Sequence, residues 1–535
     1  MQFDYLILGG GSAGAVLAAR LSEDPSLSVC LVEAGDRARD IFVRAPALVA
    51  ATVPGRPPIH NWAYHTTPQP ALNGRRGFQP RGRGLGGSSA INAMLYVRGH
   101  PADYDAWADL GAEGWDWAAC QPHFLRAERN MRGASPHHGA EGPLQVADQR
   151  RPRPISRAFV AACAEMQYPL NADFNGETQE GAGLYQVTQF WDGPSKGERC
   201  SAAAAWLHPV LGRPNLTVLT RARAEKIVIE EGRAVGALVR RGRRQMRLGA
   251  RREVIVSAGA FGSPQLLMLS GIGPAEHLRE RGIPLVLDLP GVGENLQDHL
   301  DYIISYTSPR ADVVGLNPAG LARLARAAMG WRRHGEGLFA SPMAEGGAFL
   351  RSAPDLALPD VQLHFVIGIV DQHMRRPHLA DGWSAHVCVL RPASRGTVRL
   401  ASARPFDAPL IDPAFLSDPR DEAAMLRAAR MLEGIVAAPA LAPWRGRRLY
   451  PHDGTDAGLM ADIRARADTI YHPVGTCRMG QDALAVVDPQ LRLRGVAGLR
   501  VVDASVMPTL IGGNTNAPTM MIAERAAGFI RAQPR

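Results

Sequence analysis

The segment "FDYLILGGGSAGAVLAARL", residues 3–21, joins a short apolar run, a glycine-rich turn and an alanine-rich stretch. The apolar run at 4–8 predicts a buried strand, and the stretch from about Ser12 to Leu21 predicts a helix. A second apolar run, "SVCLVEAG", follows at 28–35 and predicts another strand. Strand, helix and strand in this order form a βαβ unit, which is typical of a parallel sheet covered by helices. The N-terminal region therefore predicts an α/β fold.

Three glycines between this strand and helix have the spacing G-x-G-x-x-G, at Gly9, Gly11 and Gly14. Such glycines allow a tight turn, close approach of backbone to a pyrophosphate and close helix–strand packing, while the helix N-terminus supplies N–H donors. Glu33 ends the second strand about 20 residues further on, where a carboxylate can accept both ribose hydroxyls of an adenosine. The pattern predicts a dinucleotide site and disfavours NADP, although a structural turn with an incidental Glu has the same letters.

A second glycine cluster, "RGRGLGGSSAINAMLYVRG" at residues 81–99, bears on which dinucleotide is bound. Its glycines and serines can lay backbone against a flat or anionic ligand, and the run after them predicts a helix whose N-terminus faces the same ligand. One pyrophosphate does not need two such elements. A long ligand such as FAD, whose flavin lies far from its adenine, can use both, whereas the first motif alone leaves FAD and NAD open.

The composition indicates a globular chain of more than one domain. At 535 residues the chain exceeds the ~250 to 300 residues at which single cores stop growing. The formal charge of +9 would fit a nucleic-acid ligand, but Lys occurs only at positions 196 and 226, so a compositional bias toward Arg explains it as well. The densest basic run, "RRGRRQMRLGARR" at 240–252, is expected to be a solvated hairpin. Because no basic patch is interleaved with aromatic residues, we expect no nucleic-acid partner.

The six cysteines are scattered without a C-x-x-C pair, which favours reduced thiols in a cytosolic protein. No signal peptide is expected, because the first strand begins at Phe3. The apolar stretch at 254–274 contains several glycines and Pro264, which argues against a membrane span. We interpret Val254–Ser257 as a buried strand, with Ser263 and Pro264 opening a short helix.

The middle of the chain has two further parts. Residues 215–257 contain strand-like runs separated by turns and predict a small antiparallel meander that returns to the main sheet. Residues 306–450 carry alternating runs such as "VQLHFVIGIV" and a helix-like "DEAAMLRAARMLEGIVAA", which predict a second domain. Because no low-complexity linker separates the parts, we expect the two domains to interleave along the chain.

Four motifs together resemble the glucose-methanol-choline (GMC) family of flavoprotein oxidoreductases over essentially the whole chain. They are "GGGSAG" with Glu33, the cluster at 81–99, "GAFGSPQLLMLSGIGP" at 259–274, and "YHPVGTCRMG" at 471–480 with "GLRVVDASVMPTLIGGNTNAPTMMIAERAA" at 498–527. Within the family, the chain looks most similar to bacterial FAD-dependent alcohol and choline dehydrogenases.

The resemblance implies a Rossmann-like FAD-binding domain interleaved with a substrate domain built on an antiparallel sheet flanked by helices, as in p-hydroxybenzoate hydroxylase. The FAD-binding domain would comprise residues 1–155, 196–305 and 455–535. The substrate-binding domain would comprise residues 156–195 and 306–454.

The resemblance also implies which residues hold FAD. The pyrophosphate would bind at the first glycine motif and near Asp503, the adenosine at Glu33 and Ala224, and the flavin near the second glycine cluster. The implied cofactor-binding residues are Gly9, Gly11, Ser12, Gly14, Glu33, Trp62, Gly87, Ser88, Asn92, Ala93, Ala224, Ala258, Asp503, Thr515 and Asn516. Relatives with covalently attached flavin have a histidine at the position of Ile91. Isoleucine cannot form that link, so we expect non-covalent FAD.

His472 is the candidate general base. Oxidising an alcohol removes a hydride from carbon and a proton from oxygen, and flavin N5 takes only the hydride. An imidazole, with an ordinary pKa of about 6.5, is suited to accept the proton near neutral pH. Asn516 is the expected partner, because its amide can hydrogen-bond the substrate oxygen. Pro518 suits the first position of a following helix, whose positive end would face the flavin.

Other polar residues are weaker candidates. His299, in "ENLQDHLD", is a candidate for lining the site. Glu345 could face the substrate, although a solvated carboxylate is the simpler interpretation. The adjacent His137 and His138 are expected in a surface loop. No His, Cys and Asp cluster has the spacing of a metal site.

The leading hypothesis is an FAD-dependent dehydrogenase that oxidises primary alcohols to aldehydes and passes the electrons to a quinone or another acceptor. An oxidase of the same fold that produces H2O2 is the alternative, and a non-redox hydroxynitrile lyase is less favoured. Choline remains open as substrate, but medium-chain or aryl-substituted primary alcohols are preferred. We expect a cytoplasmic enzyme and leave peripheral attachment to the inner membrane open, since a basic surface would favour anionic lipid. The sequence identifies no amphipathic anchor and leaves the oligomeric state open.

Overall fold

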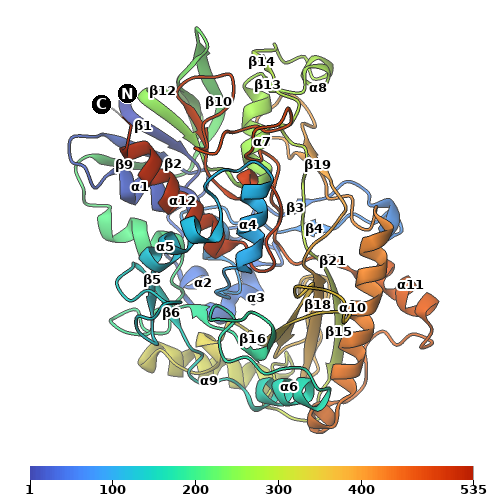
Figure 1. Ribbon diagram of the computed structural model, residues 1–535. Helices are drawn as coiled ribbons and strands as arrows, with labels where there is room; N and C mark the ends of the chain where they lie inside the picture. The colour runs from blue at the N-terminus through green and yellow to red at the C-terminus, as the bar shows by residue number, and fades with distance from the viewer. Residues whose placement is uncertain (534–535) are drawn as a thin grey trace.

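The predicted βαβ unit lies inside a seven-stranded sheet (Figure 1). In the computed structural model, which describes residues 1–533, β1 (Gln2–Leu8) leads through Gly9–Gly11 into α1 (Ser12–Leu21) and then β2 (Val29–Val32). β1 lies between β2 and β12 (Arg244–Val256) and is parallel to both. β9 (Leu216–Leu219) extends the sheet beyond β2, again in parallel. The strand and helix boundaries agree with the prediction from residues 3–35.

The other side of this sheet contains an antiparallel meander and one more parallel strand. β10 (Ala222–Glu230), β11 (Arg233–Arg241) and β12 form the predicted meander, and β22 (Leu499–Val501) pairs with the end of β12 in parallel. The meander is shorter than expected, because β9 pairs with β2 instead of joining it. The basic run at 240–252 lies largely on the exposed β11–β12 hairpin, so the prediction of a solvated hairpin is confirmed.

The second large sheet has six antiparallel strands in the order β21-β15-β18-β17-β16-β7. They are β7 (Gly181–Leu184), β15 (Leu300–Thr307), β16 (Ala344–Leu350), β17 (Val361–Val366), β18 (Gly382–Val389) and β21 (Asp468–Thr469). One face packs on α6 (Pro154–Glu165) and α10 (Pro419–Ala437), beside α11 (Asp456–Arg466) (Figure 1). β15 and β21 belong to this sheet, although both begin within ranges expected for the FAD-binding domain.

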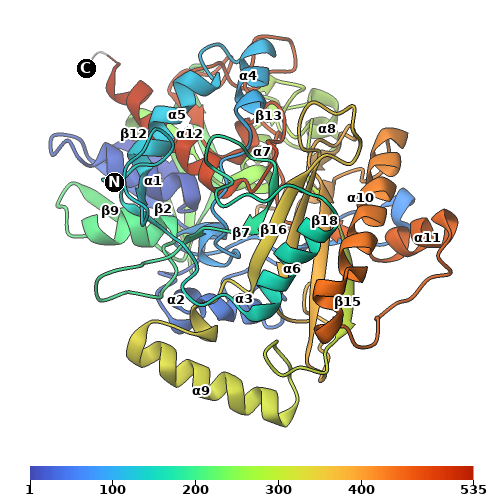
Figure 2. The same ribbon diagram turned by 60° about the horizontal axis from the view of Figure 1, so that its bottom comes forward.

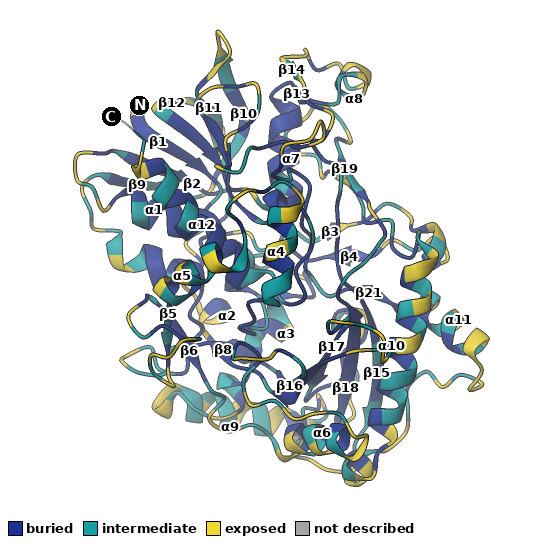
Figure 3. Cartoon of the chain, in the orientation of Figure 1, coloured by how far each residue is buried: buried dark blue, intermediate teal, exposed yellow. Residues whose placement is uncertain are grey.

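Each sheet has its own apolar core. One core surrounds β1, α1 and α12 (Asn516–Arg531), which packs along α1 although it lies at the other end of the chain. The second core lies between the six-stranded sheet and its helices. Figure 3 shows that the strands are mostly buried, whereas exposed residues gather on loops and on the outer sides of peripheral helices. The ligand-facing residues therefore lie on two rigid supports.

The remaining α-helices and β-strands complete the fold. They are the helices α2 (Ile41–Arg44), α3 (Val49–Thr52), α4 (Pro101–Asp109), α5 (Trp117–Ala127), α7 (Gly259–Leu269), α8 (Ala275–Glu280) and α9 (Pro318–His334), and the strands β3 (Tyr64–His65), β4 (Phe78–Gln79), β5 (Glu128–Asn130), β6 (Leu144–Ala147), β8 (Val187–Thr188), β13 (Ile272–Gly273), β14 (Leu287–Asp288), β19 (Thr397–Arg399) and β20 (Leu410–Asp412). No helix in the described part of the chain is both long and apolar enough to cross a membrane. All six cysteines are buried and unpaired.

α7 begins at Gly259, five residues before Pro264, the predicted first position after a cap at Ser263, so Pro264 lies inside the helix. A proline inside a helix removes the N–H that would bond the carbonyl four residues earlier, here the carbonyl of Ala260. The hydroxyl of Thr476 donates to that carbonyl at 2.6 Å. A distant side chain therefore satisfies the acceptor that the proline leaves open, and the prediction of a helix start at Ser263 is wrong.

The second glycine cluster does not lead into the predicted helix. Only a short 3-10 turn forms at Gly87–Ala90, and the chain then runs on in extended form. Gly87 has φ +53°, and a Cβ there would lie 2.7 Å from the Cα of Gly11. The cluster thus contributes backbone that lies directly against the first glycine motif.

Candidate active site

A cavity of about 350 Å³ collects nearly all predicted site residues. Its size is in the range of ligand pockets in proteins. The predicted residues that line it are Gly9, Gly11, Ser12, Glu33, Trp62, Gly87, Ser88, Asn92, Ala93, Ala224, Ala258, His472, Asp503, Thr515 and Asn516. The wall also includes residues of β16, β17 and β18, so both large sheets contribute to it.

Gly14 does not line the cavity, but the first motif needs it for packing. A Cβ on Gly14 would lie 1.8 Å from the carbonyl oxygen of Gly9, which no real contact permits. Gly9 itself has φ +114°, in the region that favours glycine. These glycines set the N-terminus of α1 closely against β1, with its free N–H groups at the cavity. That geometry fits a pyrophosphate.

Glu33 braces the two glycine segments. Its carboxylate accepts N–H groups from Gly10 at 2.8 Å, Gly35 at 2.7 Å and Gly84 at 3.0 Å. Burial raises the pKa of Glu33, although these three donors act in the opposite direction. The side chain still lines the cavity, so an oxygen lone pair can accept a ribose hydroxyl.

The two helix N-termini meet in the cavity wall. Ser12, the first residue of α1, donates its hydroxyl to Oδ1 of Asn516, the first residue of α12, at 2.8 Å. Pro518 is the third residue of α12, where its missing N–H also costs no helical bond, so the predicted first position is wrong by two residues. Asp503 accepts from the amide of Gly259 at 2.9 Å and from the hydroxyl of Ser263 at 2.5 Å, which ties α7 to the same wall.

His472 is 7% exposed and also lines this cavity. Its Nδ1 lies 3.0 Å from Nδ1 of His299, whose Nε2 lies 2.9 Å from the carbonyl oxygen of Leu390. Because a carbonyl only accepts, His299 carries its proton on Nε2 and accepts at Nδ1. His472 therefore donates from Nδ1, and its Nε2 is the unprotonated, accepting nitrogen. His299 was predicted to line the cavity, but it does not; it contacts His472 as a buried hydrogen-bond partner.

The electrostatics keep this imidazole neutral. Burial lowers the pKa of His472 well below 6.5, and His299, His364 and Arg81 lower it further. Burial likewise lowers the pKa of His299 to about 3. A neutral imidazole with an unprotonated Nε2 is the form that can accept a proton.

Asn514, which sequence reasoning did not single out, is the residue paired with His472. Its Nδ2 lies 3.1 Å from Nε2 of His472. Gln362 donates to Oδ1 of Asn514 at 3.0 Å and to the hydroxyl of Tyr185 at 3.0 Å, which fixes the amide orientation of Asn514. Asn516, the predicted partner, bonds Ser12 instead. The sequence offers two asparagines, Asn514 and Asn516, separated by one residue. Which of them faces His472 depends on where α12 begins.

The backbone before His472 is also held in place. Tyr471 has φ +79°, an unusual conformation for a bulky residue, and its carbonyl accepts from Arg81 at 2.8 Å. The amide of His472 donates to Asp298 at 2.9 Å. Burial raises the pKa of Asp298 to about 6. These contacts over-determine the strained segment, which is a common arrangement at functional sites.

The wall near His472 carries two more imidazoles. His364 on β17 and His386 on β18 are cross-strand neighbours, and both line the cavity. Neither nitrogen of His364 has a partner among the described residues, and burial lowers the pKa of His364 to about 3. His386 bonds Asp301 at 2.7 Å through Nδ1. The remaining wall is apolar there, with Met343, Val366, Val370, Met374 and Ile470.

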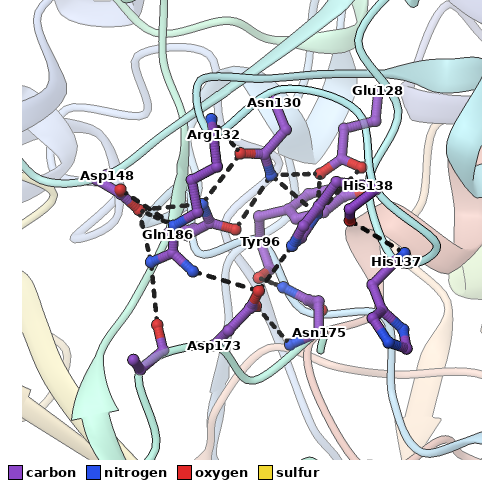
Figure 4. A network of polar contacts seen from close by, with 12 residues as sticks. Tyr96, Glu128, Asn130, Arg132, His137, His138, Asp148, Asp173, Asn175 and Gln186 are labelled. Atoms are coloured by element: carbon purple, nitrogen blue, oxygen red, sulfur yellow. Dashed lines mark hydrogen bonds and ion pairs between the residues drawn. The ribbon is translucent and has the colours of Figure 1, made fainter. Parts of the chain in front are cut away.

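Two predictions on polar residues are wrong. Glu345 is 1% exposed and accepts from Arg153, Ser156 and Ser341, so it is not a solvated carboxylate. His138 is also buried, and Figure 4 shows it between Glu128 and Asp173. His137 is partly exposed, so the prediction of a surface position holds for His137 and not for His138.

No group of His, Cys, Asp and Glu among residues 1–533 could hold a metal ion.

A dinucleotide cradle and an unprotonated imidazole in the wall of one cavity define a dinucleotide-dependent oxidoreductase. The chain belongs to the GMC oxidoreductase family, because the N-terminal model of that family matches residues 3–301 and the C-terminal model matches residues 392–523. Members of this family are FAD-dependent, so FAD is the dinucleotide of this site.

The chain is similar over its length to several known proteins. It is 46% identical to the "Alcohol dehydrogenase [acceptor]" of Pseudomonas putida, over 99% of this chain and 96% of that protein. It is 44% identical to the mitochondrial choline dehydrogenase of Homo sapiens, over 100% of this chain and 90% of that protein. Pyridoxine 4-oxidase from "Mesorbium loti" has a similar structure, with 34% identity, a TM-score of 0.89 and 100% coverage of both chains.

Proposed function

We propose that the protein is an FAD-dependent dehydrogenase that oxidises primary alcohols to aldehydes, with His472 as the general base. The observation that carries this proposal is the hydrogen-bond chain from the carbonyl of Leu390 through His299 to His472. That chain leaves Nε2 of His472 unprotonated, and the partner of Nε2 in this structure is Nδ2 of Asn514, a residue that also lines the cavity. FAD, when bound, supplies the hydride acceptor.

The side chains around Nε2 can hold the alcohol in reactive position. The substrate hydroxyl would donate its proton to Nε2 of His472 while its oxygen accepts from Nδ2 of Asn514. We therefore assign the positioning of the substrate oxygen to Asn514, and a role in seating the cofactor to Asn516, which lies with Ser12 at the pyrophosphate end. Such positioning at close distance is a large part of catalysis in oriented reactions.

The chemistry of the wall favours uncharged alcohols over choline. Of the described residues that line the cavity, only Glu33 and Asp503 are carboxylates, and both lie at the nucleotide motifs. Asp301 does not line the cavity: its Oδ2 bonds His386, and its Oδ1 has no partner among the described residues. A quaternary ammonium would face methionine, valine and imidazole there, without a carboxylate in the wall itself. Medium-chain or aryl-substituted primary alcohols fit this wall better.

The electron acceptor is proposed to be a quinone or a comparable carrier, in line with the acceptor-type dehydrogenase among the relatives. An oxidase that produces H2O2 would use the same site. Anaerobic addition of alcohol tests the redox reaction, because the flavin absorbance should bleach. Peroxide measured with and without a dye acceptor then distinguishes dehydrogenase from oxidase. Failure of every alcohol to bleach the flavin would instead favour the non-redox lyase chemistry.

We further propose the division into two domains, with one adjustment. The six-stranded sheet includes β15 and β21, so the substrate-binding domain is proposed to include residues 300–307 and 456–469 in addition to 156–195 and 306–454. The FAD-binding domain comprises the rest.

A further inference from the structure

α9 has an outward face that is unusual for a helix at a protein surface. Figures 1 and 2 show α9 at the rim of the molecule, below α2 and α3, and Figure 3 shows it largely exposed. Gly320 is the one buried residue of this helix, all of which the structure describes. A surface helix usually turns charged and polar residues outward. α9 instead turns a mixture of apolar and cationic side chains outward.

The apolar part of this face follows helical spacing. Pro318, Ala322, Ala325 and Met329 form one exposed stripe, with Leu321 beside it. Leu321 is 52% exposed and Met329 is 57% exposed. Leu316, just before the helix, is 38% exposed. Leaving such side chains in water has no benefit for folding, so the stripe indicates a contact outside the chain.

The charges on α9 are all positive. The helix contains four arginines and ends at His334, with no Asp or Glu. Arg323 pairs with Asp381, but Arg326, Arg332 and Arg333 are exposed and make no ion pair with described residues. Free arginines on both sides of an apolar stripe match an interface that has an apolar interior and an anionic surface layer.

We propose that α9 docks the protein on an anionic lipid surface, with its axis in the plane of the interface. The stripe would enter the boundary between headgroups and acyl chains, and the three free arginines would contact lipid phosphates. A protein partner is less suitable for this face of α9, because one narrow apolar stripe between arginines offers little of the broad apolar area that stable protein interfaces bury.

The position of α9 connects docking with the cavity. α9 packs on the 3-10 turn Leu338–Ala340, and the following Pro342 and Met343 line the cavity. Docking would bring that wall close to the lipid phase, in which apolar alcohols and quinones dissolve. This consequence for substrate and acceptor rests on the proposed function, whereas docking itself does not.

Vesicle binding of the full-length, FAD-loaded protein tests the proposal. We expect sedimentation with vesicles of phosphatidylcholine and phosphatidylglycerol, weaker sedimentation with phosphatidylcholine alone, and loss of binding at high salt. The double variant Leu321→Glu/Met329→Glu should bind at least about tenfold more weakly. Replacing Arg326 and Arg333 by Gln should weaken binding to the anionic vesicles only.

A matched control separates insertion from added negative charge. Leu285→Glu/Leu484→Glu introduces the same charges at sites of 51% and 46% exposure, and Leu285 lies between α8 and β14, at the opposite end of the molecule in Figure 1. This control should bind nearly as well as the unmodified protein, with only the small loss that two added negative charges cause at an anionic surface. Flavin absorbance and thermal unfolding verify that each variant is folded.

A local probe gives an independent result. Because the six native cysteines are buried, an environment-sensitive dye would label Ala325→Cys selectively. Its emission should shift to the blue with anionic vesicles. No binding to anionic vesicles at low salt, equal binding by Leu321→Glu/Met329→Glu, an unshifted dye, or capture of a protein through α9 without vesicle binding would each overturn the proposal. Alcohol-dependent bleaching is measured without vesicles, so failure of the proposed reaction is distinguishable from failure of docking.

Discussion

His299 and His472 lie with their Nδ1 atoms 3.0 Å apart and their rings at 90° to one another. Both imidazoles are buried, and both have a lowered pKa for that reason. His299 thereby acts as a neutral acceptor that fixes the tautomer of His472. Many enzymes use a carboxylate to orient a catalytic histidine, and a neutral orienter leaves the base less basic.

The pH dependence of flavin reduction should reflect the lowered pKa of His472. The base acts in its neutral form, and a lowered pKa means that protonation begins only below the ordinary range. The rate with alcohol should therefore stay constant from about pH 8 down to below about pH 6.5, with the acid limb at still lower pH. Anaerobic stopped-flow reduction measures this limb directly. A limb centred near 6.5 or above would contradict the environment assigned to His472.

Asn514 and Asn516 should have separable effects. Asn514→Ala removes the donor beside His472 and should slow flavin reduction by at least about tenfold, with FAD affinity nearly unchanged. Asn516→Ala removes the contact with Ser12 and should instead weaken FAD binding, measured by fluorescence titration, while flavin that remains bound is reduced at nearly the normal rate. The reverse pattern would restore Asn516 as the partner of His472.

FAD should be released intact from the denatured protein. Ile91 lines the cavity, 4% exposed, and has no atom that could bond covalently to a flavin methyl group. Acid precipitation should leave a colourless pellet and yellow FAD in the supernatant. A pellet that retains flavin would show that another residue holds it.

His138 should make stability depend on pH on the alkaline side. Burial acts to lower its pKa, but the hydrogen bonds to Asp173 and Glu128 prevail and raise the pKa of His138 to about 9. A raised pKa gives stability that is complete below the unfolded value of about 6.5 and is lost as pH rises through about 9. The contribution is on the order of 3 kcal/mol at most.

Denaturant unfolding of His138→Gln measures this contribution. The unmodified protein should exceed the variant in stability near pH 6.5, and the difference should shrink toward pH 10. His334→Gln, at an exposed position on α9, is the control and should change little at either pH. If the stability difference between the two proteins grew as the pH rises, His138 would not be stabilising the fold in its charged form.

Local signals predicted the N-terminal half of the site well. The boundaries of α1 follow from the glycine turn before Ser12 and the alanine-rich run after it, which are both contained in one short segment. Helix ends that depend on residues far away in the sequence were harder to predict. Pro264 indicates a helix start by itself, and only the hydroxyl of Thr476, far along the chain, makes it tolerable inside α7.

Burial of single polar residues was not predictable for the same reason. Glu345 is satisfied by Ser156 and His138 by Asp173, and neither pair is close in sequence. The sequence prediction named Asn516 as the partner of His472, whereas Asn514, just before α12, makes the observed contact and Asn516 bonds Ser12. The sequence identified no amphipathic anchor, because a basic, alanine-rich run such as α9 is equally typical of an ordinary solvated helix.

The most direct test of the account is anaerobic flavin reduction by alcohol in His472→Ala. The variant should keep yellow FAD, because His472 makes no contact with the glycine cradle, and should be reduced at least ~10²-fold more slowly than the unmodified protein. His334→Ala, which alters an exposed imidazole that does not line the cavity, serves as the matched control and should be reduced normally. Reduction of His472→Ala at the unmodified rate would show that another group takes the proton and would contradict the account.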